Sequence, residues 1–303
     1  MFTKQRIASD MKRNWSLYLM VLPVLAFYII FCYKPMYGAI IAFKDFSPGK
    51  GIWGSRWVGL EHFRTFFCGR DFIRILTNTL RISIANIIFG FPAPIILALL
   101  INEVTSKKFA KSVQTVTYLP HFISLVVVCG MIKEFVSDTG FITEFLAHFG
   151  MEKQNMLNEP DFFTPIYVIS GIWQEVGWGS IIYLAALAGV DQQLYEAAQI
   201  DGAGRFRQTI SITIPSIMPT IITMFILRLG SLMSVGYEKI ILLYNPLSSE
   251  KAEIISSYVY NVGLVKAQYG FSTAVGLFNS VINCVLVFAA NAASRKLNDT
   301  SLW

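Results

Sequence analysis

Ionisable side chains lie inside long apolar stretches of this 303-residue chain. Glu175 occupies one such stretch and Arg228 occupies the next, at similar distances from opposite ends. If both stretches form antiparallel membrane helices, the two groups reach similar depths, since each residue adds about 1.5 Å. A charge at the bilayer centre costs at least about 2.5 kcal/mol, so such groups usually pair or serve a pathway. We therefore expect Glu175 and Arg228 either to form an ion pair or to flank a solute site.

Other polar side chains have spacings that place them together on helix faces. Asn78 and Arg81 are separated by three positions, and Asn279 and Asn283 by four, so each pair shares a face. Amides and an arginine suit sugar hydroxyls or uronate carboxylates, and the alternative role for the asparagines is hydrogen bonding between helices. Three aromatic residues are available either to stack on a sugar ring or to pack: Trp173, Trp178 and Tyr183.

The sequence contains no catalytic or metal-binding pattern. The three histidines, His62, His121 and His148, are scattered, and no H-E-x-x-H motif occurs. A G-x-x-x-x-G-K-[ST] motif is also absent, so the chain has no P-loop for ATP. We interpret the four cysteines as unpaired packing residues. These observations predict a protein that is not an enzyme and that holds neither a metal nor a cofactor of its own.

The composition indicates the elements that position these side chains. The chain is 54% hydrophobic and 15% charged, whereas soluble domains carry about 25% charged residues. A membrane-spanning helix needs roughly 20 mostly apolar residues. We predict an all-α, multi-pass membrane protein forming a single domain over residues 1–303, with its core spans within about 73–291. Six stretches are long and apolar enough, near residues 15–43, 73–101, 116–136, 163–190, 217–243 and 271–291.

The positions of lysine and arginine predict the orientation in the membrane. Cytoplasmic loops carry an excess of these residues. Lys12 and Arg13 precede the first span, and "TSKKFAK" joins the second and third, so we place both of these and both termini in the cytoplasm. The excess over the other side is small. The net charge of +6 favours contact with anionic lipid headgroups, and no nucleic-acid-binding module is visible.

The segment between the fourth and fifth spans, about residues 190–219, is more elaborate than a simple turn. Asp191 can cap a short helix that runs to Gln199, and Gly202 can adopt the left-handed conformation that ends it. We expect a second short helix to begin near Ala203 and to end before Pro215. Two short helices joined by a glycine form a rigid projection on which a soluble partner can act. The alternative is an amphipathic loop at the membrane surface.

This segment resembles the EAA motif of ABC importer permeases, which has Glu-Ala-Ala, three residues, Gly, nine residues and Ile-x-Leu-Pro. The chain departs from the family pattern at Ile214, where leucine is usual, and at Thr209, where phenylalanine is usual. The longer form of the motif in sugar permeases adds Asp201, Ala203 and an aromatic residue, which Phe206 matches. The matching positions, which the resemblance identifies as the ATPase-coupling residues, are Glu196, Ala197, Ala198, Asp201, Gly202, Ala203, Phe206, Ile212 and Pro215.

The resemblance extends over the rest of the chain. "PMYGAIIAFKDFSPGKGIWGSRWVGLEHFRTFF" looks like the first outer segment of the branch that imports complex oligosaccharides, and "IWQEVGW" with "LAALAGV" is similar to carbohydrate permeases in general. The resemblance implies a six-helix type I importer permease of the bacterial inner membrane with a cytoplasmic coupling helix. Its implied partners are a second, homologous permease subunit, two ATPase subunits that bind ATP and Mg, and an extracytoplasmic binding protein that delivers an oligosaccharide.

The polar residues of the spans narrow the expected solute. Arginine donates two parallel hydrogen bonds to a carboxylate. If Glu175 neutralises Arg228, Arg81 is the cation most available to a solute carboxylate. We therefore favour an oligosaccharide with uronate units, such as one derived from alginate or pectin, and the alternative is a neutral oligosaccharide. A proton-coupled secondary transporter that uses Glu175 fits less well, because no inverted repeat is detectable.

Overall fold

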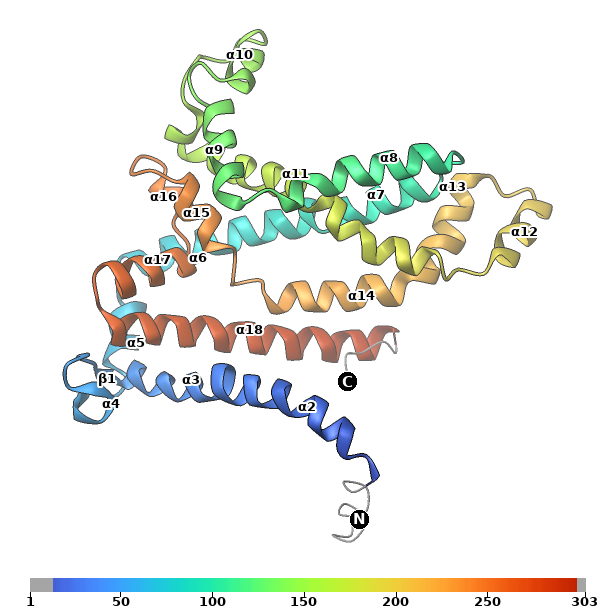
Figure 1. Ribbon diagram of the computed structural model, residues 1–303. Coiled ribbons are helices and arrows are strands. Elements are labelled where there is room, and N and C mark those ends of the chain that lie inside the picture. Colours follow the sequence, from blue (N-terminus) through green and yellow to red (C-terminus); the bar gives the residue numbers. More distant parts are fainter. Residues whose placement is uncertain (1–12, 299–303) are drawn as a thin grey trace. The chain divides into compact units, whose positions relative to one another are not determined.

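A computed structural model describes residues 13–298 of the chain (Figure 1). Lys12 and the expected positions of both chain ends therefore lie outside the described residues. The fold divides into two compact units, one formed by residues up to Phe67 with Val262–Leu277, the other by Cys68–Asn261 with the residues from Phe278 onward. Nearly all elements are helices, as the sequence predicts. The long C-terminal helix α18 (Tyr269–Asn298) contributes to both units.

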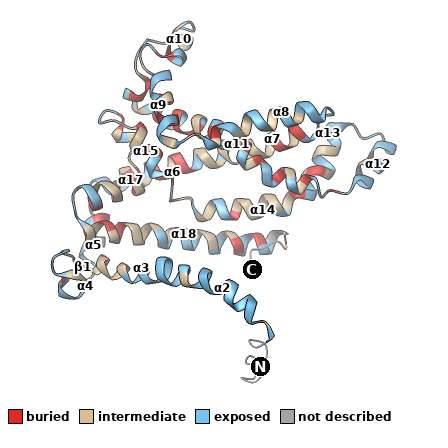
Figure 2. Ribbon diagram, viewed as in Figure 1, coloured by how far each residue is buried: buried red, intermediate tan, exposed pale blue. Residues whose placement is uncertain are grey.

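The first unit begins with a long apolar helix. This consists of α2 (Trp15–Phe27), a π-helical turn η1 (Tyr28–Tyr33), α3 (Lys34–Met36) and the 3₁₀ segment η2 (Tyr37–Phe43). Its residues are exposed around the whole of α2 (Figure 2), as expected for a helix surrounded by lipid or by other membrane helices. The helix matches the first predicted span.

A small hairpin follows this helix in the first unit. Strand β1 (Lys44–Asp45) pairs antiparallel with β2 (Arg56–Trp57), and α4 (Gly51–Gly54) lies between them. Lys44 is buried and donates from Nζ to the Ile52 carbonyl at 2.6 Å, so its charge caps the end of α4. Helix α5 (Glu61–Phe67) packs Phe66 against Phe271 of α18, with ring centres 6.2 Å apart.

The second unit is a bundle built around α11 (Pro160–Leu187). Helix α11 packs against a helix composed of α6 (Asp71–Ala85), the π turn η3 (Asn86–Gly90) and α7 (Pro92–Asn102), and against α8 (Lys107–Tyr118). The closest approach to α8 requires Gly177, because a Cβ there would overlap the carbonyl of Thr117. Apolar residues from several helices form a core of the second unit, including Ile82, Val128, Phe163 and Ile240.

Helix lengths and hydropathy bear on the six predicted spans. Trp15–Phe43, Asp71–Asn102, Arg205–Gly230 and Tyr269–Lys296 are long and apolar enough to cross a membrane. The stretch predicted at 116–136 belongs to a broken segment in which Lys107–Phe122 and Leu125–Phe135 (α9) meet at 99°. The stretch at 163–190 forms α11, which has 28 residues but is less apolar because of Gln174, Glu175 and several glycines and serines.

The span predicted at 217–243 is wrong at both ends. The helix begins earlier, at α13 (Arg205–Gln208), and continues through the π turn η6 (Thr209–Thr213) into α14 (Ile214–Gly230). Residues 231–236, called the break, are not helical, and α15 (Tyr237–Leu243) is a separate helix. Asn283 of α18 accepts a hydrogen bond from the Met233 N–H at 3.0 Å, and Ser83 of α6 donates to the Leu232 carbonyl at 2.5 Å. These side chains replace the hydrogen bonds that a continuous helix would make.

Short elements complete the second unit. Helix α10 (Phe141–Ala147) and the 3₁₀ turn η5 (Met156–Asn158) connect α9 to α11. Helix α12 (Gln192–Ile200) follows α11, and α16 (Ser249–Ala252) and α17 (Ile255–Tyr260) follow α15. The π turn η7 (Asn261–Val265) leads to α18.

Candidate functional site

Residues 191–208, called the knob, have the helix–glycine–helix form that the sequence predicts at their start. The Asp191 carboxylate accepts a hydrogen bond from the Gln193 N–H at 2.9 Å and so caps α12. Gly202 has φ of +74°, and the Ala203 N–H returns to the Ala198 carbonyl at 2.8 Å. This is the hydrogen-bonding pattern of a helix that ends in a left-handed residue. The predicted cap and the predicted glycine conformation are confirmed.

The second helix of the knob does not end before Pro215, as we expected from the sequence. Arg205–Gly230 is one helix that continues through Pro215. Proline lacks an N–H group, and the π turn at Thr209–Thr213 widens the helix directly before it, which allows the helix to continue. Tyr195 of α12 contacts Thr213 through hydroxyl groups 2.9 Å apart. The knob is therefore joined rigidly to a membrane-crossing helix.

The surface of the knob combines small, acidic and apolar side chains. Helix α12 projects beyond the end of α11 (Figure 1). Glu196, Ala197 and Asp201 are exposed, whereas Ala198, Ala203 and Ile212 are partly buried. Phe206 is 81% exposed and Ile200 is 86% exposed. Ile200 was not among the predicted coupling residues, although its position as an apolar residue near Gly202 could have indicated a contact with a partner. Exposed apolar side chains on a rigid projection are typical of a protein interface.

A cavity of about 670 Å³ lies inside the second unit, between α7, α11, α14 and α15. Four of the predicted solute-pathway residues line it: Glu175, Trp178, Tyr183 and Arg228. The cavity thus combines an aromatic wall with charged groups, which is a composition suited to a sugar. Sequence reasoning missed other lining residues, including Asn86, Gly171 and Lys239. Asn86 and Lys239 are polar and Gly171 is small, and each lies in an apolar stretch of the sequence, which could have indicated a place on the cavity wall.

Glu175 is hydrogen-bonded to His121 and does not pair with Arg228, which was one of the two expected arrangements; both groups line the cavity. His121 Nδ1 and Glu175 Oε2 are 2.9 Å apart. The imidazole ring also stacks on Trp178, with ring centres 4.4 Å apart and an angle of 3° between the planes. His121 lies in the 3₁₀ turn η4 (Leu119–Phe122), directly before the 99° bend. The bend brings this side chain to α11, which is why the sequence alone could not pair it with Glu175.

Arg228 is therefore the arginine that faces the cavity. It lies in the last turn of α14, before the break. Within the described part of the chain it forms no ion pair. It also lines a smaller space of about 130 Å³, whose polar wall includes Ser83, Asn86, Ser231 and Ser234. Hydroxyl and amide groups around an arginine provide a polar environment for an anionic group of a solute.

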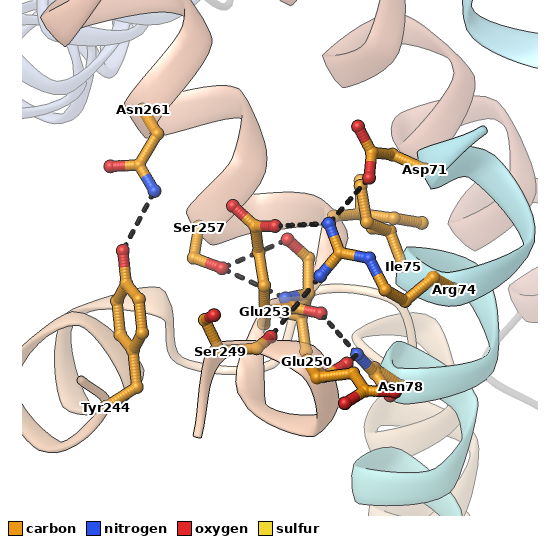
Figure 3. Close-up of polar contacts among 12 residues, drawn as sticks. Asp71, Arg74, Ile75, Asn78, Tyr244, Ser249, Glu250, Glu253, Ser257 and Asn261 are labelled. Atoms are coloured by element: carbon orange, nitrogen blue, oxygen red, sulfur yellow. Dashed lines mark hydrogen bonds and ion pairs between the residues drawn. The ribbon is translucent and has the colours of Figure 1, made fainter. Parts of the chain in front are cut away.

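Asn78 and Arg81 bind the chain's own backbone and do not line the cavity. Residues 245–253, called the strap, lie against α6 (Figure 3). Asn78 donates to the carbonyls of Glu250 and Glu253 at 2.8 and 3.0 Å, and Arg81 donates to the carbonyl of Lys251 at 2.5 Å. The strap is also held by Arg74 of α6, which pairs with Glu253, and by an ion pair between Lys251 and Asp161. The expected availability of Arg81 to a solute is thus not supported.

The remaining predicted pathway residues also have other neighbours. Asn279 and Asn283 both donate to Ser234 Oγ, at 3.4 and 2.8 Å, so they support the break. This corresponds to the alternative of hydrogen bonding between helices. Trp173 is 45% exposed and does not line the cavity, although it lies close to Glu175 in the sequence.

The fold and the site together define a class of protein. A helical bundle with membrane-crossing helices, an open cavity lined by aromatic and charged side chains, and a rigid knob at the end of one such helix is suited to a transport permease. Residues 90–299 match the family described as "Binding-protein-dependent transport system inner membrane component", and the chain belongs to that family. Among residues 13–298, no cluster of histidine, cysteine or acidic residues could hold a metal ion.

Similar proteins agree with this assignment over almost the whole chain. The chain is 45% identical to Protein LplB of Bacillus subtilis (strain 168) over 97% of its own length and 92% of the relative's. It is 43% identical to the polygalacturonan/rhamnogalacturonan transport system permease protein YteP of the same organism, over 99% and 94%. It also resembles a chain of the bacterial alginate ABC transporter solved in complex with an alginate pentasaccharide-bound periplasmic protein. The TM-score is 0.90 and the sequence identity is 45%, and the match covers 98% of this chain and 100% of that chain.

Proposed function

We propose that this chain is the permease subunit of an ATP-driven, binding-protein-dependent importer that moves an acidic oligosaccharide across the bacterial cytoplasmic membrane. The observation that carries the proposal is the cavity, which Arg228 and Trp178 both line and in which Arg228 has no carboxylate partner among the described residues. Arg228 is exposed, so its guanidinium is accessible and can donate two parallel hydrogen bonds to a solute carboxylate.

The acidic character of the solute is supported from two directions. Arg228 lines both the main cavity and the small hydroxyl-lined space beside it, so a uronate can bind its carboxylate to the guanidinium and its hydroxyls to the serines. The names of a relative and of a solved structure refer to polygalacturonan and to alginate, which are both polymers of uronic acids. A neutral oligosaccharide remains the alternative, because Trp178 and Glu175 suit any sugar ring.

The knob is the proposed coupling site for an ATPase. Small alanines on α12 permit close approach, and Phe206 and Ile200 provide exposed apolar anchors. Because the knob continues into α14 without a flexible joint, a movement of the knob is transmitted toward Arg228 in the last turn of the same helix. We assign ATP and Mg to two partner ATPase subunits, and the complete pathway to this chain together with a second permease subunit.

The arrangement of basic residues supports an orientation with the knob in the cytoplasm. A polar pocket is lined by residues 102–105 and by the knob, so the "TSKKFAK" loop and Arg205 lie at the same end of the second unit. Lysines and arginines gather on the cytoplasmic side of membrane proteins. By the same rule for lysine and arginine, we propose that the amino-terminal basic residues up to Lys12 and the C-terminus, which lie outside the described residues, are cytoplasmic as well.

Reconstitution tests the proposed function against a proton-coupled transporter. Proteoliposomes would contain either this chain alone or this chain with its second permease and ATPase subunits. Uptake of a uronate oligosaccharide is measured with and without ATP and the binding protein. We expect uptake only from the complete complex supplied with both. Uptake by the chain alone, driven by a proton gradient, would contradict the proposal.

A further inference from the structure

We propose that Lys239 is a second solute-binding cation of the cavity, and that Lys239 and Arg228 together select oligosaccharides that carry more than one negative charge. This inference rests on the proposed function, since it concerns what the same cavity recognises. It adds a residue and a charge requirement that the sequence motifs do not indicate.

The position of the Lys239 ammonium group is the first observation. Helix α15 packs on α9, and Lys239 is only 6% exposed. Its Nζ donates to the Tyr167 carbonyl at 3.2 Å and lies 5.0 Å from the centre of the Tyr167 ring. A Cβ added to Gly171 would lie 3.5 Å from Nζ. Gly171 lines the cavity, so the ammonium group fills the space beside this glycine on the cavity wall.

The hydrogen-bonding capacity of Lys239 is incompletely used. An ammonium group has three donors, and the structure gives Nζ one carbonyl acceptor and one aromatic face. No acidic side chain within the described part of the chain lies within 4.0 Å of it. Of the two acids that line the cavity, Glu175 is bound to His121, and Glu238 is the neighbour of Lys239 on α15. A buried lysine without an anionic partner is stabilised by an anionic ligand.

The surroundings of Lys239 lower its pKa. Burial lowers the pKa of Lys239 to about 8, and nearby Cys129 of α9 and Glu175 of α11 oppose this shift. The other ionisable side chains that line the cavity are Tyr167 and Tyr183 of α11, Arg228 of α14, and Tyr237 and Glu238 of α15. The ammonium form is therefore present at neutral pH and is lost as the pH rises through about 8. A bound carboxylate would favour the ammonium form.

The break places the two cations on one cavity. Arg228 lies in the last turn of α14 before the break, and Lys239 lies in the first turn of α15 after it, so each comes from a different helix. Two fixed cations at separate points match a chain of uronates, whose carboxylates repeat along the oligosaccharide. A solute with one carboxylate satisfies only one of them.

The experiment compares acidic and neutral oligosaccharides of equal length in the complete reconstituted complex, between pH 6.5 and 9.5. We expect wild-type uptake of the acidic solute, relative to the neutral one, to fall about tenfold between pH 7 and pH 9, as Lys239 loses its proton. Lys239→Arg should keep the ratio constant over this range, and Lys239→Met should lower it about tenfold already at pH 7. The control is Lys133→Met, an exposed lysine of α9, which should behave like wild type.

Other outcomes would overturn the inference. An equal loss of acidic and neutral uptake in Lys239→Met, with an unchanged wild-type pH profile, would mean that Lys239 only holds α15 to Tyr167. An unchanged ratio in Lys239→Met would remove the residue from recognition. ATPase activity stimulated by the binding protein shows in each case whether the complex is assembled. If the wild-type complex transports neither solute with ATP, the proposed function fails, and this result differs from a failure of Lys239 alone.

Discussion

His121 Nδ1 lies 2.9 Å from the Glu175 carboxylate, so the acid that lines the same cavity as Arg228 has a hydrogen-bond partner other than the arginine. Because His121 also stacks on Trp178, one side chain positions both a hydrogen-bonding group and an aromatic ring. We regard His121 as a positioning residue of the solute cavity. Its location at the bend of the broken segment links the shape of that segment to the chemistry of the cavity.

Replacement of His121 by phenylalanine tests this role. Phe keeps a flat ring that can stack on Trp178 but removes the hydrogen bond to Glu175. We expect the released carboxylate to compete with the solute for Arg228, so that KM for an acidic oligosaccharide rises several-fold while kcat changes little. Glu175→Gln added to His121→Phe should restore KM. If the double variant is no better than the single one, His121 does not act through Glu175.

The elbow of the knob makes a second prediction. Gly202 has φ of +74°, and a left-handed conformation costs a residue with a side chain about 1–2 kcal/mol. Gly202→Val should therefore displace α12 from α13 and cause the ATPase subunits and transport to be lost together, while the chain remains in the membrane. Co-purification of the ATPase and uptake measure the two effects.

Gly204 provides the matched control for this substitution. Its φ is −70°, and an added Cβ meets nothing within 4 Å. Gly204→Val should therefore retain ATPase co-purification and most of the uptake. Full ATPase recovery with Gly202→Val, or equal losses in both variants, would count against a specific role for the left-handed elbow.

The proposed orientation can be measured by cysteine labelling in a variant that lacks the four native cysteines. Ser47 in the hairpin region and Thr105 beside the knob are both exposed, whereas Ser55 is buried and unsuitable. In intact cells without an outer membrane, an impermeant thiol reagent should label Ser47→Cys but not Thr105→Cys. Membrane permeabilisation should make Thr105→Cys reactive. The reverse pattern would place the knob on the side where no ATP is available.

Local features of the sequence predicted the elements best. The spans follow from hydropathy within each stretch, and the knob follows from Asp191 and Gly202, whose conformational preferences do not depend on distant partners. Positions of helix ends inside the bundle were predicted less well. The break depends on hydrogen bonds from Ser83 of α6 and to Asn283 of α18. The sequence pattern near residue 231 does not indicate these partners, because they are distant in the chain.

Side-chain partners in the candidate site were harder to predict for the same reason. Depth in the membrane left open whether Glu175 and Arg228 pair or flank a solute site, because depth does not say which way a helix face points. His121 reaches Glu175 only because the chain bends by 99° after it. Arg81 binds the backbone of the strap, a segment with no strong pattern of its own. Four of the predicted pathway residues line the cavity, and a solute pathway through them stays a prediction.

The most direct test of the account compares Arg228→Gln with Arg81→Gln in the assembled complex, using acidic and neutral oligosaccharides of similar length. Arg228→Gln should lower uptake of the acidic solute about ten- to hundred-fold, the value of one or two charged hydrogen bonds, and should affect the neutral solute much less. Arg81→Gln should lower both equally, because it releases the strap. Selective loss of acidic uptake in Arg81→Gln, with Arg228→Gln unaffected, would contradict the account.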